Sequence, residues 1–98
     1  MFWIKFFVVK QDILLAICDK DMIGKKLKTD DHKLEVKEDF YGGKLIEDEE
    51  TVVNLMKSCT IANLIGKDIV AVAIKHGFIT EENIISIGGV PHAQFVKL

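Results

Sequence analysis

The sequence predicts an α+β fold: a single compact domain in which a mixed or antiparallel sheet carries two helices packed on one face. Apolar runs typical of strands gather near both ends of the chain, and patterns typical of helices lie between them. The expected order is therefore strand-strand-strand-helix-helix-strand-strand, and this segregation is typical of α+β domains. A hydrophobic content of 49% over 98 residues suffices for one core, so residues 1–98 are expected to form one domain.

The first three elements are predicted to be strands. Residues 2–9 are apolar at almost every position, which indicates a strand that is buried on both faces and central to the sheet. Residues 13–18 form a second buried run, close enough to pair with the first as an antiparallel hairpin. Asp19 caps a brief helical turn that ends at Gly24, and residues 33–37 alternate as a half-exposed strand.

Two helices follow these strands. Asp48 is the expected N-cap of the first helix, which is acidic in its first turn and apolar along one face, and Asn63 and Gly66 interrupt it. The second helix is expected over residues 67–76, where a glycine stops it. Its apolar side chains cover much of its circumference, so this helix should be largely buried.

Two short strands are predicted at the C-terminal end. Residues 80–83 form a turn, and residues 84–87 and 93–96 are strands on either side of a glycine turn. The segments 84–85 and 95–98 either form an exposed sheet edge that pairs two chains or are covered within one chain. The sequence leaves the oligomeric state open.

Composition argues against several classes of protein. The longest apolar run, residues 69–74, is far shorter than the roughly 20 residues of a membrane span. All 13 basic residues are lysine, so the bidentate phosphate contacts of arginine are missing, and nucleic-acid binding gains little support. Cys18 and Cys59 have no metal-ligand spacing, so we expect no metal, no cofactor and reduced thiols in a cytoplasmic protein.

The most distinctive pattern is a glycine-proline-histidine segment near the C-terminus. Gly88 and Gly89 allow positive φ, and Pro91 fixes its own φ, which displays His92 beside the turn. One interpretation is a structural turn in which His92 bonds a backbone carbonyl. In the other, the glycine amides bind an anion, His92 supplies a proton and Lys25 or Lys26 supplies a counter-charge.

An aromatic, glycine-bearing loop offers a second candidate contact. Phe40 and Tyr41 precede Gly42 and Gly43, and an aromatic pair there can stack a base. However, residues 38–50 carry six acids and one lysine, which suits a basic protein surface better than RNA. The structural alternative is that Phe40 packs on the core while Tyr41 keeps its hydroxyl at the surface.

Two further polar or reactive groups have structural explanations. Asn63 lies between apolar residues, where its amide either reaches a substrate or closes a helix. Cys59 with His92 as its base is a conceivable nucleophile, but its place on the apolar helix face predicts burial and poor ionisation. We therefore expect no catalytic residue.

Four segments in order along the chain resemble one known family. These segments are Cys18-Asp19 with Gly24-Lys25, Asp39-Phe40-Tyr41-Gly42-Gly43, Ala62-Asn63-Leu64-Ile65-Gly66 and Ile87-Gly88-Gly89-Val90-Pro91-His92-Ala93-Gln94. Together they are similar to a small archaeal family of uncharacterised cytoplasmic proteins, domain-of-unknown-function family 424. The resemblance implies a stand-alone archaeal domain of mixed α and β structure, loosely associated with translation, and implies no activity or substrate.

Three functions from different classes follow. The leading hypothesis is a non-enzymatic binding module that docks on a protein or ribonucleoprotein partner through the glycine-proline-histidine turn and the aromatic loop. The second is a small enzyme or ligand-binding protein for an anionic, phosphate- or carboxylate-bearing metabolite, with His92 as general acid or base. The third is direct RNA binding through Lys25, Lys26 and Lys28 with Tyr41 stacking on a base.

Overall fold

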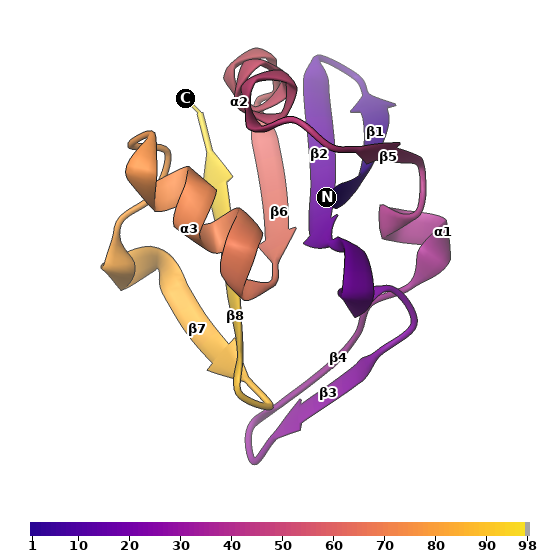
Figure 1. Ribbon diagram of the computed structural model, residues 1–98, viewed down its shortest axis with the longest axis vertical. Coiled ribbons are helices and arrows are strands. Elements are labelled where there is room, and N and C mark those ends of the chain that lie inside the picture. The colour runs from indigo at the N-terminus through magenta and orange to yellow at the C-terminus, as the bar shows by residue number, and fades with distance from the viewer. Residues whose placement is uncertain (98) are drawn as a thin grey trace.

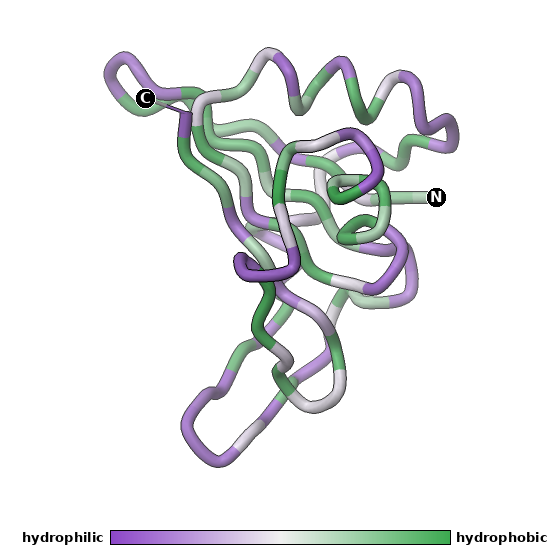
Figure 2. Tube along the Cα trace, turned by 90° about the vertical axis from the view of Figure 1, so that its left-hand side faces the viewer, coloured by the Kyte–Doolittle hydropathy of each residue, from purple (hydrophilic) through white to green (hydrophobic). Residues whose placement is uncertain are grey.

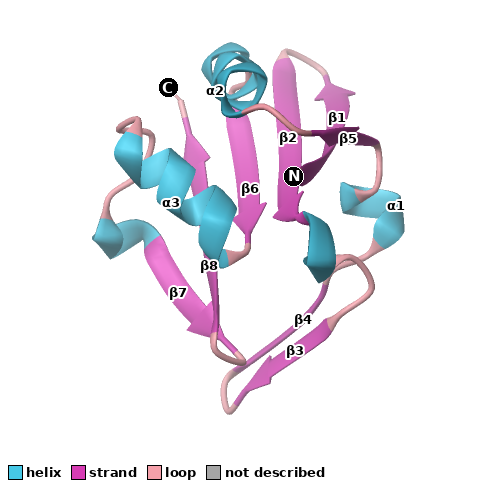
Figure 3. Ribbon diagram, viewed as in Figure 1, coloured by secondary structure: helices cyan, strands magenta, loops and turns pink. Residues whose placement is uncertain are grey.

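The computed structural model describes residues 1–97, in which a six-stranded mixed sheet is combined with a separate two-stranded hairpin and three α-helices (Figures 1 and 3). The strands are β1 (Phe2–Val9), β2 (Asp12–Asp19), β3 (Lys26–Thr29), β4 (His32–Glu35), β5 (Lys44–Ile46), β6 (Ile61–Ile65), β7 (Ile84–Ile87) and β8 (Val90–Val96). The helices are α1 (Glu38–Tyr41), α2 (Glu49–Ser58) and α3 (Lys67–Lys75), with 3-10 turns η1 (Lys20–Met22) and η2 (Glu81–Asn83).

The large sheet has the order β5-β1-β2-β6-β8-β7. Strands β2 and β6 are parallel, and the other neighbouring strands of this sheet are antiparallel. The predicted α+β class and the mixed sheet are therefore confirmed. The β1–β2 hairpin is also confirmed, with all eight residues of β1 in register with β2.

The principal core lies between the sheet and two helices. Figures 1 and 3 show α2 and α3 on the same side of the sheet. Fully buried Leu15, Ile17 and Leu64 from the central strands pack against Met56 of α2 and Ile69 of α3. Burying large aliphatic side chains contributes about 1.5–3 kcal/mol each, so this layer supplies most of the driving force for folding.

A second, smaller core lies on the opposite face of the sheet. There the β3–β4 hairpin and α1 cover one end of the central strands. Ala16, Cys18 and Ile65 of the sheet pack against Tyr41 of α1 and Leu27 of the hairpin. The other end of this face carries no such cover, and this asymmetry creates the surface considered below.

The predicted element order is incomplete, chiefly because β6 was missed. Residues 61–65, expected to continue a helix that Asn63 and Gly66 interrupt, form a central strand between β2 and β8. Helix α2 ends at Ser58, and Cys59 already has extended backbone. Strands β3 and β5 and helix α1 were also not predicted. Residues 61–65 are a short apolar run, and the periodicity of such a run does not distinguish a helix from a strand. Pairing with β2 on one side and β8 on the other is what makes this run a strand.

Strand β1 is buried on both faces only in its first half. Strand β5 is three residues long and pairs only with Phe2, Trp3 and Ile4, whereas Val8 and Val9 are exposed. The expectation of a strand buried throughout is thus wrong for its outer half. The reason is that no helix or hairpin of the described residues buries Val8 or Val9, which lie next to the β1–β2 turn.

Most boundaries of the remaining predicted elements agree with the structure. Asp48 caps α2, accepting a 2.9 Å bond from the Thr51 amide, and α3 ends just before Gly77 as expected. Strand β8, however, begins at Val90 and lies inside the sheet between β6 and β7. Strand β7 pairs only with Val90–Ala93, so among the described residues Phe95 and Val96 pair with β6 alone. The edge predicted at 84–85 and 95–98 is thus unpaired on its outer side; Leu98 lies outside the described residues.

Candidate functional site

The two glycines of the glycine-proline-histidine segment form a tight turn. Gly88 and Gly89 join β7 to β8 with φ of 57° and 80°, the conformation that a two-residue hairpin turn requires. The Gly88 amide donates a 2.7 Å hydrogen bond to the hydroxyl of Thr29, at the end of β3. A Cβ at Gly88 would lie 3.1 Å from the Lys28 amide nitrogen, so the turn docks closely on the hairpin. This amide is therefore engaged within the fold, which weakens the anion-site hypothesis.

Pro91 and His92 are strand residues rather than turn residues. The Pro91 carbonyl accepts a 3.0 Å hydrogen bond from the Gly66 amide. His92 is half-buried in β8, between Ile65 of β6 and Ile85 of β7. Burial, with a smaller contribution from nearby His32, holds the pKa of His92 below its ordinary value of 6.5. The ring is neutral at pH 7, which does not favour a role as proton donor.

The depressed pKa of His92 predicts an acid-sensitive stability. The unfolded chain protonates His92 near pH 6.5, whereas the folded protein resists protonation to lower pH. Stability is therefore complete above this pH and falls as the pH drops through 6.5 towards the folded pKa. We expect the melting temperature to fall less between pH 7.5 and 5.5 in His92→Gln than in the wild type. Equal falls in both proteins would contradict this assignment.

The aromatic loop belongs to the fold more than to the surface. Tyr41 is only 3% exposed, and burial raises its pKa to about 12, so its ring lies inside the fold. Phe40 stacks on Phe7 with ring centroids 5.2 Å apart, which confirms that it packs onto the sheet. A Cβ at Gly43 would collide with the Ile4 carbonyl, and one at Gly42 would lie 2.7 Å from the Glu38 carbonyl oxygen. Both glycines permit close backbone approach.

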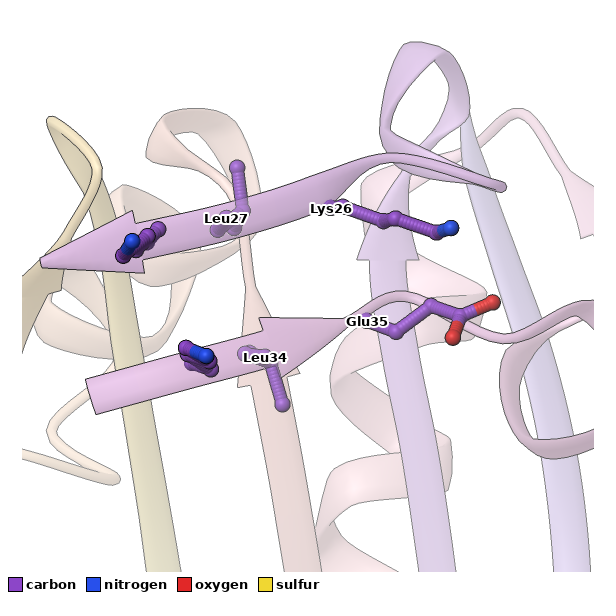
Figure 4. A pocket seen from close by; sticks show the side chains of 6 residues that line it. Lys26, Leu27, Leu34 and Glu35 are labelled. Carbon is purple, nitrogen blue, oxygen red and sulfur yellow. The ribbon is translucent and has the colours of Figure 1, made fainter.

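The lysines of the hairpin lie apart from the other predicted contacts. The backbone amide of Lys25 donates a hydrogen bond to the Met22 carbonyl, and its carbonyl accepts one from the Val36 amide. The lysine that contacts the glycine turn is Lys28, not Lys25. A groove of about 460 Å³ runs along the hairpin (Figure 4). Its lining residues are Lys26, Leu27, Lys28, Lys33, Leu34 and Glu35. Because Tyr41 is buried, these lysines and the stacking ring of the RNA hypothesis do not share a surface.

Asp19, which the sequence predicted as the cap of the turn that follows it, is a buried carboxylate at the end of β2, the strand that pairs in parallel with β6. Asp19, 5% exposed, ends β2 and accepts bonds of 3.0 and 2.9 Å from the amides of Asp68 and Ile69 at the start of α3. Burial raises the pKa of Asp19, and the two amides oppose that shift. Gly66 lies so close that a Cβ there would collide with the carboxylate. The amides at the start of α3, which would otherwise attract an anion, are thus already bonded to a carboxylate of the chain itself.

A small cavity of about 140 Å³ adjoins this carboxylate. It is bounded by Asp19 and Asp21 on one side, by Lys67 and Asp68 at the helix start, and by Pro91 from β8. The end of β2, the start of α3 and residues 89–91 therefore meet at this cavity, although they are far apart in sequence. Three carboxylates against one lysine make this cavity a poor site for a phosphate.

An open region of the second sheet face brings Asn63 to the surface. Asn63 pairs with Ala16 and Gln94, and the next residues across the sheet are the apolar row Phe7, Leu14, Ile61 and Val96. We call these side chains the open sheet face: Phe7, Leu14, Ile61, Asn63, Gln94 and Val96. Figure 2 shows both longer helices on one side of the strands and the other side bare in the upper part of the view.

The open sheet face is apolar with two amides at its centre. Its members are half-buried or exposed, with Val96 56% exposed, and Phe40 stacked on Phe7 forms one rim. Among residues 1–97, no hydrogen bond joins the side chain of Asn63 or Gln94 to another residue. Sequence reasoning missed this surface because β6 was not predicted as a strand.

Neither reactive thiols nor a metal cluster accompany these features in the described part of the chain. Burial raises the pKa of Cys18 to about 12 and also raises that of Cys59, so both free thiols are poor nucleophiles. No group of three or more His, Cys, Asp or Glu residues within 1–97 is placed to hold a metal ion. No helix over the same residues is long and apolar enough to cross a membrane.

Fold and surface together define a small α+β domain with one helix-covered and one partly open sheet face. The family described as "Protein of unknown function (DUF424)" matches residues 8–98, and the chain belongs to this family. The fold is similar to the crystal structure of an uncharacterized conserved protein from Methanopyrus kandleri, an archaeon, with a TM-score of 0.80 and 26% identity. That alignment covers 99% of this chain and 93% of the other. No curated protein matches the chain.

Proposed function

We propose that this protein is a non-enzymatic binding module that docks on a protein or ribonucleoprotein partner through the open sheet face. The observation that carries the proposal is the apolar row Leu14, Ile61 and Val96, left uncovered beside Asn63 and Gln94, with Phe7 at its rim under the Phe40 ring. Contiguous apolar surface on a soluble domain marks interaction sites, because its burial against a partner is favourable.

The chemistry of this face suits a protein partner. Its apolar row provides area to bury, and the amides of Asn63 and Gln94 can both donate and accept hydrogen bonds without the cost of burying a charge. Phe40 and Phe7 add aromatic side chains at one rim, and aromatic residues are enriched at protein interfaces. The aromatic loop thus contributes a rim, while Tyr41 supports the fold from inside.

The two other hypotheses gain less from the same geometry. The anion hypothesis needs free backbone amides, but the Gly88 amide donates a hydrogen bond to the Thr29 hydroxyl. The first amides of α3 donate to the Asp19 carboxylate. The RNA hypothesis needs an exposed stacking ring, but Tyr41 is buried. We also propose a cytoplasmic location, in keeping with the two free buried thiols, and translation complexes as one setting for the partner.

Affinity purification of tagged variants tests the docking proposal. Val96→Glu and Asn63→Lys each place a charge on the open sheet face, and Ile74→Glu makes the matched change on the exposed side of α3. We expect recovery of the partner to fall at least about tenfold for both face variants, because desolvating an unpaired charge opposes binding. Recovery with Ile74→Glu should equal that of the wild type.

The same experiment distinguishes the alternatives. Partner proteins should persist through ribonuclease and high salt if docking is between proteins, whereas RNA contacts weaken steeply with salt. Circular dichroism of each variant confirms that the fold is intact. Unchanged recovery with both Val96→Glu and Asn63→Lys would refute docking through this face.

A further inference from the structure

The inner face of the β3–β4 hairpin belongs to the fold. Leu27 is buried in the second core, and the Thr29 hydroxyl accepts the hydrogen bond from the Gly88 amide. Alternate residues of a strand share a face, so Leu27 and Thr29 of β3 lie on the inner face together with their partners Leu34 and His32 of β4. The residues that alternate with them therefore point outward, away from the sheet.

The outer face of the hairpin is positively charged. It carries Lys26 and Lys28 of β3 and Lys33 and Glu35 of β4, all of them exposed. Lys28 lies directly opposite Lys33, and like charges in such a pair are destabilising. Among residues 1–97, no side-chain ion pair or hydrogen bond engages any of the three lysines. The hairpin thus holds two opposed ammonium groups that the described part of the chain does not neutralise.

The groove of about 460 Å³ described above follows this face (Figure 4). At one end of the groove, Lys26 is paired with Glu35, so the charges of that end balance. At the other end, Lys28 and Lys33 leave two positive charges. The acids of the hairpin turn are not among the lining residues, so the groove carries a net positive charge.

We propose that this outer face binds an acidic, extended segment of a partner protein, whose carboxylates lie against Lys28 and Lys33. A carboxylate placed between two opposed ammonium groups replaces their repulsion with attraction. Residues two apart on a strand are roughly 6.6 Å apart, which is also the spacing of alternate side chains on an extended peptide. Acidic residues at alternate positions of the partner therefore match Lys26 and Lys28 along β3.

The groove favours a peptide over a nucleic acid. Single-stranded nucleic acids bind through stacked bases as well as phosphates, and no aromatic side chain lines the groove. Glu35 opposes a continuous phosphate backbone, whereas a peptide can place a neutral residue opposite this carboxylate. The proposal does not rest on the docking function, because the open sheet face shares no residue with the groove.

A nuclear magnetic resonance titration tests the binding. The ligand is a short peptide of alternating glutamate and threonine, and the control peptide has glutamine in place of glutamate. We expect saturable shifts of the amides of residues 26–35 below about 1 mM acidic peptide, the range of a few exposed ion pairs, and none with the control. No saturable shift of these residues would overturn the proposal. Tighter binding of a uridine oligonucleotide to the same residues would also overturn it, because the surface would then belong to RNA.

Charge reversal separates binding from a structural role of the lysines. Lys28→Glu should weaken binding of the acidic peptide at least about tenfold, because it replaces attraction with repulsion. The same change should leave the melting temperature at or above that of the wild type, because an opposite-charge pair with Lys33 replaces the like-charge pair. Lys57→Glu makes the matched change on an exposed residue of α2, on the other side of the sheet, and should bind the peptide as the wild type does.

The outcomes distinguish this proposal from the docking function. Equal losses of peptide binding for Lys28→Glu and Lys57→Glu would reflect net charge alone and would overturn the hairpin site. Val96→Glu alters the open sheet face and leaves the hairpin lysines unchanged, so it should retain peptide binding. Peptide binding and partner recovery through the open sheet face therefore respond to different variants.

Discussion

Replacing Gly66 with alanine is expected to lower the free energy of unfolding by about 4 kcal/mol. Gly66 has φ of 121° and ψ of 151°, a conformation that side chains of L-residues rarely adopt and that costs about 1–3 kcal/mol. The added Cβ would also collide with the Asp19 carboxylate, and overpacking of this kind typically costs about 1–3 kcal/mol. Both penalties act on the residue that joins β6 to α3.

Urea unfolding followed by circular dichroism measures this loss. Gly77→Ala is the matched control, because Gly77 also has positive φ, at 78°, but a Cβ there meets nothing within 4 Å. The control should lose only the conformational penalty, about 1 kcal/mol. Equal losses for the two variants would show that the contact with Asp19 does not constrain Gly66.

Replacing Asp19 with alanine is expected to lower the free energy of unfolding by about 3 kcal/mol. The change leaves the Ile69 amide buried, and the Asp68 amide partly buried, without their acceptor. A buried donor without a partner costs about 1–3 kcal/mol, and the loss of a helix cap falls in the same range. The contact also ties the end of β2 to α3, so its removal loosens both elements.

Two companion variants separate the causes. Asp19→Asn keeps one oxygen acceptor and should lose less stability than Asp19→Ala. Asp21→Ala removes an exposed neighbouring carboxylate and should change stability by less than about 0.5 kcal/mol. If Asp21→Ala proved as damaging as Asp19→Ala, the two amide bonds would not explain the effect.

Local patterns predicted the elements whose signals are self-contained. The β1–β2 hairpin, the α2 cap at Asp48 and the end of α3 before Gly77 all depend on residues close together in sequence. Strand β6 was missed because residues 61–65 form a short apolar run directly after a helix. Only pairing with β2 and β8 on both sides decides that this run is extended.

The candidate site was harder to predict than the fold, for the same reason. The sequence singled out Gly88, Gly89 and Asn63, but their surroundings come from distant segments. The hydroxyl that engages Gly88 belongs to Thr29, and the α3 terminus is capped by Asp19, forty-nine residues before Asp68. Such contacts leave no periodic or spacing signal in a single sequence.

The parallel pairing of β2 with β6 divides the sheet into two halves. Strands β5, β1 and β2 come from residues 2–46, and β6, β8 and β7 come from residues 61–96, so each half is assembled from one part of the chain. Backbone pairing between the halves is confined to this seam, which the Asp19 contacts close at one end. Cooperative unfolding of the domain therefore depends on the seam, on the core shared by both halves and on the Gly88–Thr29 contact, because segments joined only by local contacts can open as separate units.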